Sequence, residues 1–188
     1  MNTTMREFDH SLWESRAYGR RDRALEKGYS ACAIETELKR NLLAAKDIKQ
    51  IVEWASKKKI KVFFVKQESG EWQHDAKIAI IATSLNPVNQ SVILLHELGH
   101  YLVDSRSCTD ERFIQGYPRQ MIPSVHHEFN HRLACLEEEM EAWNRGWKLA
   151  TRLKLNVKRS EFDEMRIKCL KSYIKWSVNP KPCSLYNE

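Results

Sequence analysis

Apolar residues recur along most of this chain at the spacing of helices. The clearest case is the segment 47–58, in which apolar side chains return every three or four residues and so gather on one side of a helix. We expect that side to pack on the core of the protein. Composition and spacing also predict helices over residues 11–27, 31–45, 87–103, 133–153 and 160–178.

Two short segments have instead the composition of strands. Residues 60–66 and 76–83 are rich in residues that favour extended backbone, and a polar turn around residues 68–71 separates them. Strands that follow each other closely in sequence commonly pair antiparallel. The pattern therefore predicts an α+β fold, with a small antiparallel sheet packed on helices.

The predicted helix 87–103 contains the sequence His96-Glu97-Leu98-Gly99-His100, with apolar residues on several of its sides, as expected of a buried helix. Two histidines four positions apart project from nearly the same side of a helix. They lie about 40° apart around its axis and about 6 Å apart along it, so both imidazoles can reach one metal ion. Glu97 lies beside them and can take a proton from a zinc-bound water. The pattern indicates a zinc metallopeptidase, and the alternative is a hydrogen-bonded pair of core histidines.

The start of this helix is also marked in the sequence. Asn86 followed by Pro87 is typical of an N-cap and a first helical residue. The helix would then begin more than two turns before His96.

A catalytic zinc usually has three protein ligands, so a further ligand must come from elsewhere in the chain. Val103 and Arg106 stand where metzincins have glycine and histidine, which excludes that class. Two kinds of candidate lie downstream, namely carboxylates and histidines. They are the acidic run Glu137 to Glu141 and the histidines His126, His127 and His131.

Helical spacing favours Glu139 among these candidates. In the predicted helix 133–153, Glu139 shares an apolar face with Ala142, Trp143, Gly146 and Ala150. Glu138 and Glu141 fall instead towards Arg145, so we interpret both as solvent-exposed partners of basic residues.

The motif His96-Glu97-x-x-His100, followed by Glu139-x-x-Ala142-Trp143, resembles the glutamate-zincin metallopeptidases, in particular the ImmA/IrrE-like group. The resemblance covers roughly residues 46–155. It implies a minimal zincin-like core in which His96, His100 and Glu139 bind Zn²⁺ and Glu97 is the general base. Trp143 departs from the pattern, because many such sequences carry Asp or Asn there, which can orient a ligand.

The resemblance also implies how a substrate binds. In glutamate-zincins a sheet edge beside the metal receives an extended peptide by strand addition, and the strand 76–83 directly precedes the predicted metal-binding helix. Proteins of the ImmA/IrrE-like group often cleave a regulatory protein, commonly a transcriptional repressor. We therefore expect a protein or peptide substrate.

The length of 188 residues and the hydrophobic content of 42% fit one compact domain. We expect an N-terminal helical segment over residues 1–45, the zincin-like metallopeptidase domain over 46–178 and a polar tail over 179–188. The first ten residues have no apolar run, and no stretch approaches the length needed to cross a bilayer. The sequence thus predicts a cytoplasmic protein without a membrane partner.

The cysteines are odd in number, scattered and without a C-x-x-C pair, which predicts reduced thiols rather than a disulfide framework. They are Cys32, Cys108, Cys135, Cys169 and Cys183.

The formal net charge of +6 permits an acidic partner. Basic residues cluster near the N-terminus and around residues 57–61, but Asp22 and Glu26 interrupt the first cluster. The second cluster lies between a predicted helix and a predicted strand, where lysines commonly keep a turn soluble. We interpret both clusters as solvated surfaces; the less favoured alternative is nucleic-acid binding through the basic surface, which predicts an affinity that falls steeply with salt. The clusters comprise Arg16, Arg20, Arg21 and Arg23, and Lys57, Lys58, Lys59 and Lys61.

A long connection over residues 104–129 contains glycine and prolines and is a candidate lid or substrate-recognition segment. Tyr117, His126 and His127 in it are candidate donors of a hydrogen bond to the oxyanion that forms during peptide hydrolysis, although residues of these types are more often surface or packing residues.

These observations lead to a zinc-dependent endopeptidase as the first hypothesis. The alternative is a non-catalytic, metal-stabilised interaction module of the toxin–antitoxin or phage-encoded type. Replacing Glu97 with Gln separates the two, because only the peptidase needs a general base.

Overall fold

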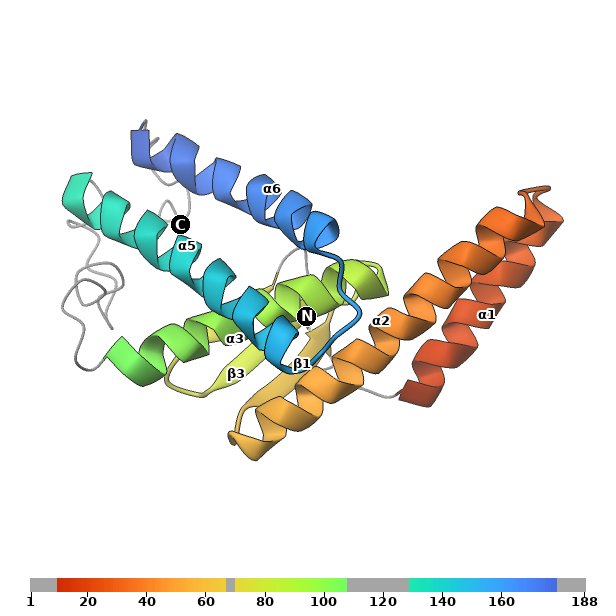
Figure 1. Ribbon diagram of the computed structural model, residues 1–188, viewed down its shortest axis with the longest axis horizontal. Coiled ribbons are helices and arrows are strands. Elements are labelled where there is room, and N and C mark those ends of the chain that lie inside the picture. The colour runs from red at the N-terminus through yellow and green to blue at the C-terminus, as the bar shows by residue number, and fades with distance from the viewer. Residues whose placement is uncertain (1–9, 67–69, 108–128, 179–188) are drawn as a thin grey trace, which may run out of the picture.

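The computed structural model describes residues 10–66, 70–107 and 129–178. Its helices and strands form an α+β fold in which helices predominate (Figure 1). In chain order the elements are α1 (His10–Glu26), α2 (Ala31–Lys57), β1 (Lys61–Val65), β2 (Glu71–Gln73), β3 (Ile78–Ala82), α3 (Pro87–Ser107), α5 (Phe129–Arg152) and α6 (Arg159–Val178).

The sheet has three strands in the order β1-β3-β2. β1 is parallel to β3, with Phe63 opposite Ile80, whereas β2 is antiparallel to β3, with Trp72 opposite Ala79. The expected antiparallel pairing of the segments 60–66 and 76–83 is therefore wrong. The chain does not turn directly from β1 into β3. It first forms β2, a strand of three residues that begins in the predicted polar turn, and β2 pairs with the side of β3 that faces away from β1. The open edges of the described sheet are β1 and β2, so the strand expected beside the metal is central.

The two helices expected over residues 31–45 and 47–58 form one continuous helix, α2. Its second half carries the predicted apolar face, and Ile48, Ile51 and Ala55 are fully buried. Its first half pairs with α1, and these two helices extend to one side of the molecule (Figure 1). The predicted domain division at residue 45 falls inside this helix.

Helix α3 lies between the sheet and α5, which explains why apolar residues surround it. The backbone N–H of Asn89 donates to Asn86 Oδ1 at 2.8 Å, so Asn86 is the predicted N-cap. Gln90 Nε2 donates to the carbonyl oxygens of Ala82 and Leu85, which ties the start of α3 to the end of β3. Within the described residues, no helix has the combination of length and apolarity that crossing a membrane requires.

The last helix, α6, packs on α5. Phe162 and Leu170 are buried as expected, but Ile167, Ile174 and Val178 are exposed. The expected continuous apolar face is thus only partly present, because α6 contacts the domain through one narrow side.

Candidate metal centre

Helices α3 and α5 cross with their backbones in contact. A Cβ atom added to Gly99 would collide with the carbonyl group of Ala142, because it would lie 2.7 Å from the carbonyl carbon. A Cβ atom added to Gly146 would lie 2.6 Å from the carbonyl oxygen of Leu95. Glycine and alanine at this crossing let the helices approach more closely than larger side chains permit. The Ala142 of the E-x-x-A motif is therefore part of the packing that brings Glu139 to the histidines.

At this crossing His96 and His100 of α3 meet Glu139 of α5. The two Nε2 atoms are 3.3 Å apart, His96 Nε2 is 3.3 Å from Glu139 Oε2, and His100 Nε2 is 3.5 Å from Glu139 Oε1. One donor atom from each residue lies within 4.8 Å of the others, and all three residues are buried. Zinc bonds of about 2.0–2.1 Å in tetrahedral geometry place ligand atoms roughly 3.3–3.4 Å apart. The three residues thus form a group that could hold a metal ion.

The structure brings Glu139, the favoured candidate, to the two histidines of α3, whereas His131 lies apart from them. His131 is buried two turns before Glu139, and its Nε2 lies 3.5 Å from Cys135 Sγ. The alternatives His126 and His127, together with Tyr117, lie outside the described residues, as does most of the expected lid.

Glu97 is buried beside the two histidines and next to the start of β2. A Cβ atom added to Gly70 would lie 2.6 Å from Glu97 Oε1 and 2.5 Å from Ile93 Cγ2, so the missing side chain of Gly70 leaves room for the carboxylate. Burial raises the pKa of Glu97, while the neighbouring His96 and His100 act in the opposite direction.

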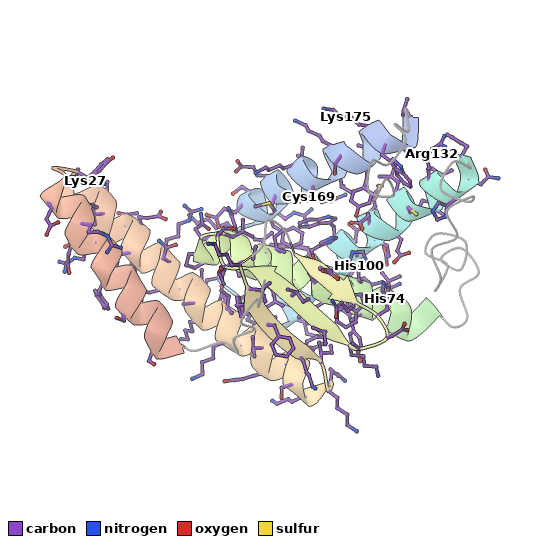
Figure 2. The ribbon with its side chains drawn as sticks, turned by 180° about the vertical axis from the view of Figure 1, so that it is seen from behind. Lys27, His74, His100, Arg132, Cys169 and Lys175 are labelled. Carbon is purple, nitrogen blue, oxygen red and sulfur yellow. The ribbon has the colours of Figure 1, made fainter. Side chains whose placement is uncertain are left out.

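Each of the three candidate ligands also contacts a residue outside the group. The ring of His96 stacks on Trp143, with centroids 4.2 Å apart and planes 15° apart. His100 Nδ1 lies 3.6 Å from Glu138 Oε1, and the Tyr173 hydroxyl of α6 donates a hydrogen bond to Glu139. Figure 2 labels His100 on α3, close to α5.

The position of Glu138 corrects the expectation that it faces solvent. It is 3% exposed, because α3 and α6 both pack on α5 and together bury a wide arc of that helix. Glu141 does pair with Arg145, at 2.8 Å between Oε1 and Nε, as expected. Glu137 is exposed.

The buried carboxylates give the site an excess of negative charge. Burial alone would lower the pKa of His100, but Glu138, Glu139 and Glu97 raise it to about 9. Burial alone would raise the pKa of Glu139, but His96, His100 and Tyr173 lower it to about 2. A divalent cation would neutralise this charge, which is a second reason why these residues fit a metal.

Three residues of the site were not predicted from the sequence: Gly70, Glu138 and Tyr173. The only signal for Tyr173 was its place on the apolar side of the last helix, which suits a packing residue equally well. Among the described cysteines, Cys32, Cys135 and Cys169 are not in disulfide bonds, as expected.

Comparison of this chain with known protein families, with curated proteins and with solved structures found no significant match.

Proposed function

We propose that this protein is a zinc-dependent endopeptidase. The observation that carries the proposal is the convergence of His96, His100 and Glu139 within 4.8 Å, with Glu97 buried beside them. Three protein ligands would leave one coordination position of a zinc ion for water, as hydrolysis requires. The alternative, a metal that only stabilises an interaction module, does not need a buried carboxylate beside the residues that would hold the metal.

We choose zinc because of the three candidate ligands and because of Glu97 beside them. Two imidazoles and one carboxylate also suit non-haem iron. Glu97, which directly follows the first histidine ligand, favours hydrolysis, because its carboxylate provides the general base that a peptidase needs.

The residues of this chain have distinct roles in the proposed reaction. A bound zinc ion would supply Lewis-acid activation of water and of the peptide carbonyl. His96, His100 and Glu139 would hold the ion, while Glu97 would accept a proton from the attacking water and return it to the leaving amine.

The open edge of β2 is the proposed place for the substrate. β2 packs against α3, and Gly70 just before it lies against Glu97. An extended peptide paired with this edge would run next to the general base, with main-chain hydrogen bonds that do not depend on its side chains. The strand that the sequence suggested for peptide binding, β3, has no open edge, because both of its sides are already paired. A regulatory protein such as a repressor remains the substrate class that the resemblance favours.

The test uses purified full-length protein and the variant Glu97→Gln. We expect the wild type to contain one zinc per chain and to cleave proteins in a cell extract, with the new termini identified by mass spectrometry. Glu97→Gln should retain the zinc and lose the cleavage, because only the proton acceptor is removed. Glu137→Gln, which makes the same change at an exposed position, is the control and should cleave normally.

Two results would contradict the proposal. Wild-type protein that neither contains zinc nor can be loaded with it would exclude a zinc enzyme. Equal cleavage by Glu97→Gln and wild type would show that Glu97 is not the general base.

A further inference from the structure

Glu138 is a buried carboxylate beside the ligand group. It directly precedes Glu139 on α5 and is 3% exposed. Burying an ionised carboxylate is costly unless a cation or a hydrogen-bond donor meets it. The partner that the structure provides is His100, whose Nδ1 lies 3.6 Å from Glu138 Oε1.

The two nitrogens of His100 therefore face different groups. Nε2 lies 3.3 Å from His96 Nε2 and 3.5 Å from Glu139 Oε1, within the candidate ligand group, whereas Nδ1 faces Glu138. A neutral imidazole carries its proton on one nitrogen only, and the nitrogen that binds a metal must be unprotonated. A carboxylate next to Nδ1 favours the proton there and leaves the lone pair of Nε2 directed at the ion.

His96 is held in another way. Its Nδ1 is buried without a hydrogen-bond partner among the described residues, and its ring stacks on Trp143. Position 143 is where the peptidases that this chain resembles often have Asp or Asn. Here Trp143 supports His96 by ring stacking, and the carboxylate beside a candidate ligand is that of Glu138, which faces His100.

We propose that Glu138 is a positioning residue that fixes the tautomer and the orientation of His100 for metal binding. This role rests on the proposed metal site and adds a residue to it. Glu138 acts through His100 and is not itself one of the three ligands. Removing such an outer partner of a ligating histidine typically weakens metal binding about 10–100-fold.

The experiment compares Glu138→Gln with Glu137→Gln in the full-length protein. Both variants remove one negative charge from neighbouring positions of α5, but only Glu138 contacts His100. Zinc affinity is measured by competition with a chromophoric chelator. We expect the dissociation constant to rise about 10–100-fold in Glu138→Gln and to change less than about twofold in Glu137→Gln.

A second measurement does not depend on the folding of a variant. Long-range proton–nitrogen NMR spectra of the zinc-loaded wild type report which nitrogen of His100 carries the proton. We expect it on Nδ1, and a proton on Nε2 would overturn the role of Glu138.

The possible failures are distinguishable. Wild-type protein that takes up no zinc overturns the proposed function and this role with it. Zinc affinity that is unchanged in Glu138→Gln, or equally reduced in Glu137→Gln, overturns only the role of Glu138.

Discussion

Replacing Gly99 with alanine tests the helix crossing on which the candidate metal centre depends. Gly99 faces the backbone of Ala142, and its added Cβ would lie 2.7 Å from the carbonyl carbon of that residue. Real Cβ atoms essentially never come this close to another heavy atom. The neighbour is helix backbone rather than a flexible side chain, so α3 and α5 must move apart before the methyl group fits.

The expected magnitude combines two opposite effects. Alanine is favoured over glycine inside a helix by about 1 kcal/mol. Forcing an extra methyl group into a packed core costs typically about 1–3 kcal/mol, and a rigid backbone contact belongs at the upper end of this range. We expect a net loss of about 2 kcal/mol in the free energy of unfolding. For a chain of this size, 1 kcal/mol corresponds to roughly 2–4 °C, so Tm should fall by about 4–8 °C.

The assay is thermal unfolding of the metal-free protein, with Gly19→Ala as the control. Gly19 lies in α1, and a Cβ atom added there would meet nothing within 4 Å. Its replacement should leave Tm unchanged or raise it slightly, since only the helix preference changes. If Gly99→Ala is as stable as Gly19→Ala, the two helices do not cross in the way described. In a folded Gly99→Ala variant zinc affinity should also fall, because His100 and Glu139 move apart with the helices.

Three further predictions concern the ligands. Glu139→Ala should lose bound zinc while His131→Ala retains it, as metal analysis of the purified proteins would show; undiminished zinc in Glu139→Ala would place the third ligand elsewhere. The pKa of His100 is raised from 6.5 to about 9 in the folded metal-free protein, so its stabilising effect is complete below pH 6.5 and is lost as the pH rises towards 9. Urea unfolding in EDTA should show that the free energy of unfolding decreases over this pH range. An equally steep decrease with pH in His100→Gln would contradict the prediction. Tyr173→Phe removes one hydrogen bond to Glu139 and should weaken zinc binding about tenfold, while it lowers the free energy of unfolding by only about 1 kcal/mol; unchanged affinity would show that Tyr173 does not orient the ligand.

Features that depend on neighbouring residues in the sequence were predicted correctly. The N-cap at Asn86, the shared side of His96 and His100, and the inward face of Glu139 all follow from the geometry of a single helix. Such features need no knowledge of what packs on the helix. For the same reason the two longer strands were located to within a few residues.

Features that depend on distant parts of the chain were not predicted. β2 has only three residues and one buried side chain, Trp72, so its sequence resembles a turn. Its position on the far side of β3 is nevertheless what makes β1 and β3 parallel. The sequence of α5 places Glu138 in solvent, because charged residues usually face water. The second packing surface of α5, formed by α6, is not visible in that sequence pattern.

The residues that contact the three candidate ligands show why a short motif describes this site incompletely. The H-E-x-x-H and E-x-x-A motifs specify the atoms that could bind an ion, but His96, His100 and Glu139 are each oriented by another residue. Trp143 and Glu138 come from α5, and Tyr173 comes from α6, a helix that lies beyond the stretch of resemblance to glutamate-zincins. If Glu139 binds a metal ion, the groups that hold its carboxylate in place affect the strength of binding, so we expect metal affinity to depend on α6 as well as on the two helices that carry the motifs.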